Sequence, residues 1–289
     1  MITSRCTLKC SMCAHSGPDG EDFPISAVKG MALQLAELGV KVVYVTGGEP
    51  FARKDLRAVV APMLEEGLEI RLSTNATTVT AKRAEELEGI QDISVSIDGN
   101  ERVHDRIRGV KGAWKRAVEG IKRIRESQPS SRVSLSFTLM PANMDEINAV
   151  FELAETLGVH SVGVQPWAPA FGGAKTWQRN AGQFAKMAST LKNLARLNHP
   201  LNCNGAEYYQ AAADYVEKGF RRHGKCKAGG RIFTLFPNGG VSPCWAFAAT
   251  ANAIEDGLNK AIQSRGFEAA SSGAGEGQCP GCMFYCYYQ

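Results

Sequence analysis

The 289-residue sequence has no apolar run long enough to cross a membrane, and no signal peptide precedes its first cysteine. It also lacks a run of Lys and Arg, and its formal net charge is only +4, with 21% charged residues. So small a charge does not indicate nucleic-acid binding, which needs a basic stripe that follows the phosphates. A hydrophobic content of 44% suffices for one large domain or two modest ones. We therefore expect a soluble cytoplasmic protein with neither a membrane nor a nucleic acid as partner.

Cysteine, in contrast, is plentiful and clustered. The chain has nine cysteines, an odd number that disulfides alone would not use up. Three lie at the start of the chain and six lie beyond residue 200. In a cytoplasmic protein, clustered thiolates indicate ligands of a metal or of an iron–sulfur cluster. A small buried residue explains Cys203, but it does not explain the clusters.

The stretch RCTLKCSMCAHS, residues 5–16, places Cys6, Cys10 and Cys13 in the spacing C-x3-C-x2-C. A structural metal site takes four protein ligands, whereas three thiolates leave one coordination position open for a reacting molecule. A zinc site would need a fourth ligand, and His15 is close enough in the sequence to supply it. The spacing alone leaves both kinds of site open.

The first 166 residues alternate between helical and strand-like segments. With the residues ahead of Cys6 they make about six β/α units, although only five residues precede that cysteine. The alternation predicts an α/β fold, a partial (β/α)6 barrel whose parallel strands hold ligands at their carboxyl ends. Pro62 should kink its helix or mark its start. Strands are expected at 41–45, 69–74, 92–98, 132–139 and 161–166, and helices at 25–38, before Gly67, and at 81–88, 113–126, 145–157, 182–197 and 205–219.

The stretch VVYVTGGEP places Gly47, Gly48, Glu49 and Pro50 at the carboxyl end of the strand 41–45. Paired glycines let a ligand approach the backbone closely and reach its polar groups. Because this segment follows a buried strand in a chain that opens with three spaced cysteines, it favours the iron–sulfur interpretation over zinc.

With these two motifs the sequence resembles the radical S-adenosylmethionine (radical SAM) enzymes. The resemblance implies that the three leading cysteines hold a [4Fe–4S] cluster, whose open iron is chelated by the amino and carboxylate groups of S-adenosylmethionine (SAM). It also implies that the GGEP segment binds the SAM amino group and that polar residues at the ends of strands 69–74 and 92–98 contact its carboxylate and ribose. A thioether at position 12 can pack on the adenine. The cofactor-binding residues expected in this way are Met12, Gly47, Gly48, Glu49, Pro50, Ser73, Asn75, Ser96 and Asp98.

The stretch HDRIRGVKGAW, residues 104–114, resembles the subgroup of this family that carries extra cysteines at its carboxyl end. His104 and Asp105 are expected to cap and hydrogen-bond a loop rather than to act as bases.

The tail, CKAGGRIFTLFPNGGVSPC followed by CPGC, resembles the auxiliary-cluster extension called SPASM in its full form and Twitch in its shortened form. Asn238-Gly239 between apolar runs predicts a β-hairpin there. Five cysteines cannot ligate two clusters fully, so the resemblance implies one auxiliary [4Fe–4S] cluster, with a zinc ribbon as the structural alternative. The expected ligands are Cys226, Cys244, Cys279 and Cys282, with Cys286 in reserve, and the expected domains are 1–167 (barrel), 168–225 (helical linker) and 226–289 (auxiliary domain).

For function, the resemblance implies reductive cleavage of SAM to a 5′-deoxyadenosyl radical, which removes a hydrogen atom from the substrate. Flavodoxin or ferredoxin would supply the electron. The first hypothesis is an oxidoreductase or epimerase of a polar small molecule, such as a sugar or aminocyclitol, with Cys203 or Cys286 as hydrogen-atom donor. The second is a maturase that crosslinks or epimerises a ribosomally made peptide; many of these carry a leader-binding domain before the first cysteine, for which this sequence has no room. The third, a non-catalytic iron–sulfur or zinc-binding module, is disfavoured by the GGEP segment.

Overall fold

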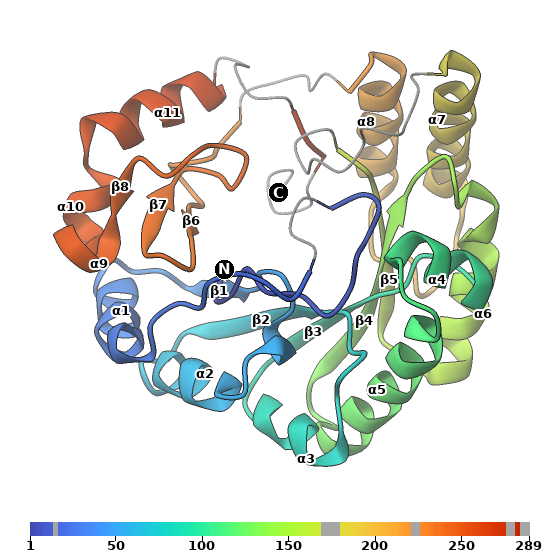
Figure 1. Ribbon diagram of the computed structural model, residues 1–289. Helices are drawn as coiled ribbons and strands as arrows, with labels where there is room; N and C mark the ends of the chain where they lie inside the picture. Colours follow the sequence, from blue (N-terminus) through green and yellow to red (C-terminus); the bar gives the residue numbers. More distant parts are fainter. Residues whose placement is uncertain (14–16, 169–179, 221–225, 276–280, 284–289) are drawn as a thin grey trace.

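The computed structural model describes residues 1–13, 17–168, 180–220, 226–275 and 281–283 (Figure 1). Its centre is a parallel sheet in the order β1-β2-β3-β4-β5, wrapped on its outer side by helices, as the predicted partial barrel requires. The strands are β1 (Val42–Val45), β2 (Glu69–Thr74), β3 (Asp92–Ser96), β4 (Arg132–Leu139) and β5 (Ser161–Pro166). The helices between and around them are α1 (Ile25–Glu37), α2 (Leu56–Glu65), α3 (Ala81–Ala84), α4 (Glu101–Arg108), α5 (Ala113–Ser127) and α6 (Ile147–Leu157), with short 3-10 turns η1 (Pro50–Ala52), η2 (Glu85–Leu87) and η3 (Met144–Glu146).

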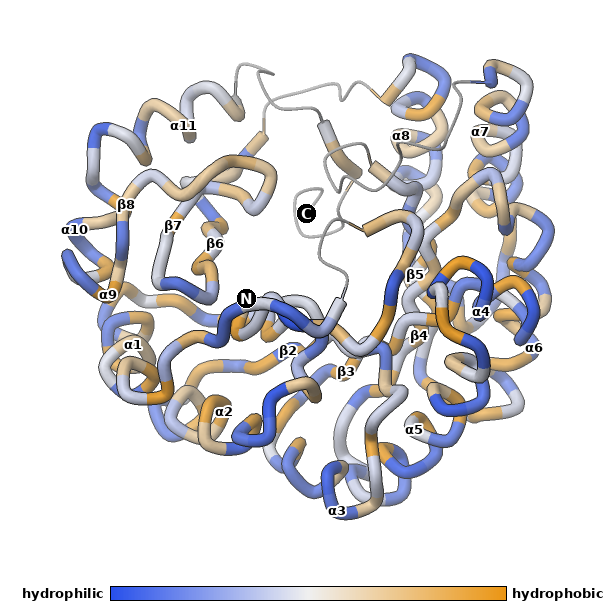
Figure 2. Tube along the Cα trace, in the orientation of Figure 1, coloured by the Kyte–Doolittle hydropathy of each residue, from blue (hydrophilic) through white to orange (hydrophobic). Residues whose placement is uncertain are grey.

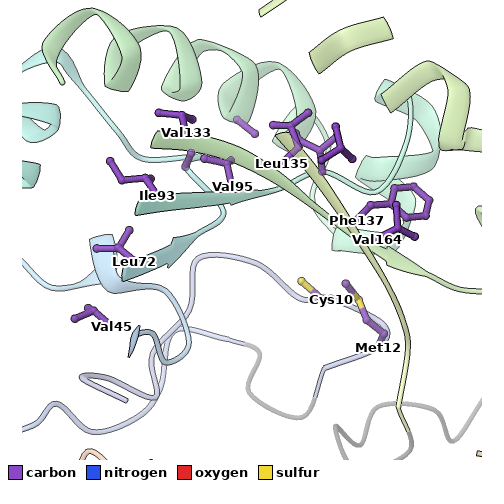
Figure 3. Close-up of a cluster of buried hydrophobic side chains, with 14 of the residues drawn as sticks. Cys10, Met12, Val45, Leu72, Ile93, Val95, Val133, Leu135, Phe137 and Val164 are labelled. Carbon is purple, nitrogen blue, oxygen red and sulfur yellow. The ribbon is translucent and has the colours of Figure 1, made fainter. Parts of the chain in front are cut away.

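The strands form because β-branched and other apolar residues occupy every second position and pack beneath the helices. Figure 3 shows Ile93, Val95, Val133 and Leu135 on this covered side, and all four are almost completely buried. Burying such a side chain contributes roughly 1.5–3 kcal/mol each. The intervening polar residues therefore face the opposite, concave side of the sheet.

The sixth strand of the predicted barrel is reduced to a single bridge. Thr3 pairs in parallel with Gly47, and the Ile2 amide donates to the Thr46 carbonyl at 2.8 Å. Pro62 lies inside α2, so it does not mark the start of that helix.

Helix α4 departs from the sequence prediction. His104 and Asp105 lie inside a helix that is capped by Asn100, whose Oδ1 accepts from the Val103 amide at 3.1 Å. Asp105 still binds the following loop as expected, since its carboxylate accepts from the amides of Gly112 and Trp114. The helix was missed because most of ERVHDRIR is charged and its apolar stripe holds only Val103 and Ile107.

The rest of the described chain adds the helices α7 to α11 and a small antiparallel sheet. The predicted hairpin at Asn238-Gly239 is present, since Gly239 has a φ of 83° and joins β6 to β7. The amide of Leu258, at the start of α10, donates to Oε1 of Gln34 at 2.7 Å, and this hydrogen bond joins α10 to α1. The elements are α7 (Ala181–Arg196), α8 (Ala206–Glu217), β6 (Thr234–Leu235), β7 (Gly240–Ser242), β8 (Ala251–Asn252), α9 (Ala253–Asp256), α10 (Leu258–Ile262) and α11 (Arg265–Gly275). Within the described ranges, no helix has both the length and the apolar character that a membrane crossing requires.

Candidate active site

The loop that carries the first three cysteines crosses the concave side of the sheet, near the carboxyl ends of the strands. Figure 3 shows Cys10 and Met12 approaching the sheet from this loop, on the side away from the labelled strand side chains. Cys6, Cys10 and Met12 are buried, whereas Cys13 is half-buried. Two backbone hydrogen bonds fasten the loop to the end of α4: the amides of Lys9 and Ser11 donate to the carbonyls of Arg108 and Ile107 at 3.1 and 2.9 Å.

Two side chains donate hydrogen bonds to the cysteine sulfurs. Arg108 reaches Sγ of Cys10 at 3.8 Å, and Nδ2 of Asn75 reaches Sγ of Cys6 at 4.0 Å. Burial raises the pKa of Cys6 to about 11 and also raises the pKa of Cys10. A bound metal must therefore displace the proton of each buried thiol, and donors aimed at sulfur favour the resulting thiolate.

Arg108 is held in place by a buried ion pair with Asp98. Its Nε donates to Oδ2 of Asp98 at 2.6 Å, and the Asp98 side chain is 0% exposed. The other carboxylate oxygen accepts from the Thr138 amide at 3.0 Å, and Nδ2 of Asn143 donates to the Asp98 carbonyl at 3.1 Å. Asp98 thus fixes the arginine that touches Cys10, and its expected contact with the SAM ribose stays a prediction.

His104 contacts the backbone of Asp98, the acid of this ion pair. The Asp98 amide donates to Nδ1 of His104 at 3.2 Å, so Nε2 carries the proton of the neutral ring. Burial and the nearby charge of Arg108 lower the His104 pKa to about 3, which keeps the ring neutral at physiological pH. In the described part of the chain, Nε2 is buried with no hydrogen-bond partner.

The GGEP segment lies directly against the backbone that leads into the cysteine loop. A Cβ on Gly47 would lie 2.1 Å from the carbonyl oxygen of Thr3, and one on Gly48 would lie 2.1 Å from that of Arg5. The amides of Gly48 and Glu49 donate to those same two carbonyls at 2.9 and 2.8 Å. Only glycine permits this approach, so the pair fixes where the first cysteine stands.

Glu49 joins the ends of two strands. It is 1% exposed, and its carboxylate accepts from the Phe51 amide, from Oγ1 of Thr74 and from the Asn75 amide at 3.1, 2.6 and 2.6 Å. Burial raises the Glu49 pKa, and the three donors oppose that effect. These contacts brace the segment, while binding of the SAM amino group by Glu49 or Pro50 remains a prediction.

The remaining expected SAM contacts fall into two groups. Asn75 is buried and braces the loop, since its Nδ2 also donates to Oγ1 of Thr7 at 3.1 Å. Ser73 is exposed and Ser96 is half-buried, and both alternate with covered residues, so they face the concave side. Further polar residues continue this face across the sheet: Ser94, Ser134, Ser136, Thr138 and Gln165. The structure thus brings Asn75 and the GGEP segment against the cysteine loop, whereas Ser73 and Ser96 share with the loop only the concave side of the sheet.

From the sequence alone, Trp167 could be either a residue near the substrate or a core residue; in the structure it lies in the core. It is 6% exposed, its Nε1 donates to the Met12 carbonyl at 3.3 Å, and its ring packs edge-on against Phe220 with centroids 5.7 Å apart. The contact of Arg108 with Cys10 was not predicted from the sequence, because it joins two positions far apart in the chain.

A second group of cysteines gathers beside the small sheet. Cys226, Cys244 and Cys282 share one hydrophobic cluster with Ala228 and Ala274. The amide of Ala246 donates to Sγ of Cys244 at 3.4 Å, another donor aimed at a ligand-type sulfur. Cys279 and Cys286 lie outside the described residues, as does His15. Among the described residues, no group of three or more His, Cys, Asp or Glu side chains is arranged to hold a metal ion, so the auxiliary ligand set stays a prediction, as do the three domain boundaries.

Helix α8 holds the segment around Cys282. Tyr208 donates its hydroxyl to the Met283 carbonyl at 2.7 Å, and Tyr215 donates to the Gly281 carbonyl at 3.1 Å. Both tyrosines are almost fully buried, and each such hydrogen bond contributes about 1 kcal/mol.

The double variant Tyr208→Phe/Tyr215→Phe is therefore expected to lose auxiliary iron selectively. Iron after anaerobic reconstitution should fall from roughly eight towards four per chain, the content of one [4Fe–4S] cluster. Electron paramagnetic resonance of the reduced protein should retain the signal of the SAM-binding cluster. Tyr209→Phe is the control: Tyr209 lies on the same helix, but its hydroxyl donates to Asn202 and not to the segment around Cys282. Full iron content in the double variant would contradict the role given to α8.

Cys203 lies on the concave side of the sheet. Its Sγ would be 3.4 Å from a Cβ on Gly163, which alternates with the covered residues Val162 and Val164. The side chain is exposed, yet the protein atoms around the thiol raise its pKa, and Sγ hydrogen-bonds Oδ1 of Asn204 at 3.4 Å. The thiol therefore keeps its hydrogen at neutral pH.

The comparisons with known proteins agree with this geometry. The model of the radical SAM superfamily matches residues 1–154, more than half of the chain, and the chain belongs to that superfamily. Fe-coproporphyrin III synthase of Methanosarcina barkeri is 36% identical over 159 residues, which cover 53% of this chain and 39% of that protein. AdoMet-dependent heme synthase of the same organism is 28% identical over 275 residues, 88% of this chain and 78% of that protein. PqqA peptide cyclase of Bradyrhizobium diazoefficiens is 28% identical over 260 residues, 85% of this chain and 65% of that protein.

Solved structures show the same fold. Streptococcus suis SuiB bound to precursor peptide SuiA has a TM-score of 0.71 at 16% identity, covering 94% of this chain and 65% of that one. The anSMEcpe structure with bound AdoMet and Cp18Cys peptide has a TM-score of 0.71 at 14% identity, covering 93% and 80%. The chain thus spans only about two fifths of the coproporphyrin synthase and under two thirds of SuiB.

Membership of the radical SAM superfamily confirms the resemblance that the motifs predicted. The protein's cofactors are those of the family, SAM and a [4Fe–4S] cluster, and the auxiliary cluster stays a prediction. The names of these relatives give no support to the predicted sugar or aminocyclitol substrate; they are a haem synthase, a peptide cyclase and an enzyme bound to a precursor peptide.

Proposed function

We propose that this enzyme modifies a ribosomally made peptide. The observation that carries the proposal is the concave face of the sheet, where Ser and Thr hydroxyls stand in neighbouring register on β2, β3 and β4. Uncharged hydroxyls both donate and accept, so they suit the alternating amide and carbonyl groups of a peptide backbone. Support also comes from the relatives, since SuiB and anSMEcpe were solved with peptides and a peptide cyclase aligns with most of the chain.

A haem precursor is the second candidate, because a haem synthase aligns with 88% of the chain. Such molecules carry carboxylates, which arginines bind best. Among the described residues on strands β2 to β5 that face this side, the arginines are Arg71 and Arg132, and both pair with acids: Arg71 with Glu69 at 2.7 Å and Arg132 with Asp92 at 3.4 Å. This neutral lining favours the peptide.

When bound, the iron–sulfur cluster supplies the electron that cleaves SAM, which creates a radical able to remove a hydrogen atom from carbon. The residues of this chain position the cysteine loop and the peptide. The GGEP segment and Arg108 hold the cysteine loop, and the hydroxyl face orients the peptide against it. The product is oxidised if the substrate radical then loses an electron, and it is epimerised if the radical regains a hydrogen atom on its other face.

The test is an anaerobic assay of the reconstituted enzyme with dithionite, SAM and candidate precursor peptides. We expect 5′-deoxyadenosine to form, and a peptide to change in mass or stereochemistry. Cys10→Ala, which removes one cluster ligand, should show neither. Deoxyadenosine formation that only a tetrapyrrole stimulates would favour the second candidate, and no deoxyadenosine above the Cys10→Ala level would refute both.

The same assay in deuterated water tests whether the Cys203 thiol donates a hydrogen atom to the substrate. We propose that Cys203, which keeps its hydrogen on the concave face, gives that hydrogen atom to the substrate carbon radical and becomes a thiyl radical. One electron from the dithionite in the assay and one proton from the solvent then restore the thiol. The wild-type product should then carry solvent deuterium, and the Cys203→Ala product should not. Unchanged deuterium in Cys203→Ala would exclude this role and direct attention to Cys286→Ala.

A further inference from the structure

We propose that the exposed surface formed by Lys9, Lys111 and Arg116, named here the basic surface, is the docking site for an acidic electron-carrier protein. The inference rests on the proposed radical SAM chemistry, and it places the partner of that chemistry on this chain.

The first step is the position of Lys9. The cysteine loop alternates between buried and exposed residues: Cys6, Leu8 and Cys10 point inward, while Thr7 and Lys9 are exposed. Lys9 therefore stands at the surface between two cluster ligands. Because electrons enter a buried centre most readily where the protein covering is thinnest, a carrier gains most by binding here.

The second step is that other cations continue this surface. A Cβ on Gly109 would lie 2.3 Å from the Lys9 carbonyl oxygen, so the turn after α4 rests on the cysteine loop. Lys111 follows in this turn, and the Arg116 side chain donates to the Lys111 carbonyl at 3.3 Å. A surface groove continues from there, with these lining residues: Thr77, Thr78, Val79, Thr80, Lys115, Arg116, Glu119 and Arg123. Thr77 contacts Thr7 of the loop, with hydroxyl oxygens 3.3 Å apart.

The third step is that three acids of α4 and α5 beside this surface already have partners. Glu101 pairs with Lys115 at 3.3 Å, Glu119 pairs with Lys122 at 2.9 Å, and Asp105 accepts from backbone amides. In the parts of the chain that the structure describes, Lys9, Lys111 and Arg116 make no ion pair. The surface beside the cluster ligands therefore carries excess positive charge, although the whole chain is nearly neutral.

A carrier with an acidic face around its redox centre complements this surface. Opposite charges steer such encounters and raise association rates by about 10–10³-fold, an effect that salt suppresses. In the transfer itself, the carrier loses one electron and the iron–sulfur centre gains it, so a flavodoxin in its hydroquinone form becomes the semiquinone. No bond is made or broken in this step.

The experiment compares two charge-reversal variants of the holoenzyme. Lys111→Glu/Arg116→Glu changes the basic surface but no cluster ligand. Lys29→Glu/Lys41→Glu makes the same change in net charge around α1, which lies beside β1 at one edge of the sheet in Figure 1, away from α4 and α5. Cluster reduction is followed by absorbance and electron paramagnetic resonance, with either an acidic flavodoxin hydroquinone or photoreduced 5-deazaflavin as reductant. The Kd for flavodoxin is measured by calorimetry.

At low ionic strength, Lys111→Glu/Arg116→Glu should be reduced by flavodoxin about tenfold more slowly than wild type, with a correspondingly higher Kd. The α1 variant should behave as wild type, and the small deazaflavin should reduce all three proteins equally. Added salt should slow the wild type towards the variant. Equal flavodoxin rates in the two charge-reversal variants, or no reduction of wild type by flavodoxin, would overturn the proposal.

Two further outcomes separate this proposal from the proposed function. If flavodoxin reduction shows the expected pattern but no deoxyadenosine forms in any protein, docking stands and the function fails. If Lys111→Glu/Arg116→Glu loses peptide modification with deazaflavin while its flavodoxin rate is unchanged, the surface serves the substrate and the docking proposal fails.

Discussion

Replacing Gly48 with alanine is expected to remove the SAM-binding cluster while leaving most of the fold in place. The added Cβ would lie 2.1 Å from the Arg5 carbonyl oxygen and 2.8 Å from that of Ser4, both backbone atoms that cannot turn aside. The backbone next to Cys6 must then move away from the sheet. Overpacking of this kind costs about 1–3 kcal/mol, here concentrated on the segment that leads into the cysteine loop. Iron after reconstitution should fall by about four per chain, and SAM binding should be lost.

The measurements are iron and sulfide analysis, and calorimetric titration with SAM. Gly30→Ala is the matched control, because Gly30 lies exposed in α1 with no atom within 4 Å of an added Cβ. That substitution should keep all the iron and raise the free energy of unfolding by roughly 0.5–1 kcal/mol. A Gly48→Ala protein with full iron and normal SAM affinity would show that the close approach does not position the loop.

Replacing Arg108 with glutamine is expected to cost the most stability of the changes considered, about 3–5 kcal/mol, because it leaves Asp98 buried without its cation. It also removes the donor to Sγ of Cys10. Loss of such an outer partner typically weakens metal binding by about 10–100-fold. Anaerobic urea unfolding and competition with an iron chelator measure the two effects separately.

Two companion variants distinguish these effects. Arg106→Gln, an exposed arginine on the same helix, should change the free energy of unfolding by less than about 0.5 kcal/mol. The double variant Arg108→Gln/Asp98→Asn removes both buried charges, so it should regain much of the stability yet still bind iron weakly. If iron affinity returns together with stability, the hydrogen bond to Cys10 has no role of its own.

The sequence predicted the sheet well because its evidence is local. Runs such as KVVYV and DISVSID show the alternation and branching of covered strands, and the helices between them have clear apolar faces. The cysteine and GGEP motifs are equally local, so they identified the loop and the segment that meet in the structure.

What the sequence could not provide are contacts between distant positions. Asp98 looked like a cofactor residue at a strand end, and only the folded chain shows that Arg108 and Thr138 occupy its carboxylate. Glu49 similarly proves to be a brace between two strands. The peptide-maturase alternative was ranked too low because it was judged on the length of chain before Cys6, which carries no information about the concave face.

The aromatic contacts of Trp167 have a consequence for how the protein unfolds. Its indole touches Met12 at one end and Phe220 at the other, Phe220 packs on Tyr215 with centroids 5.4 Å apart, and Tyr215 holds Gly281 beside Cys282. An unbroken series of contacts therefore runs from the cysteine loop to the segment around Cys282. The barrel and the tail should melt in a single cooperative transition, and stripping iron from the tail should loosen hydrogen exchange at Met12 as well.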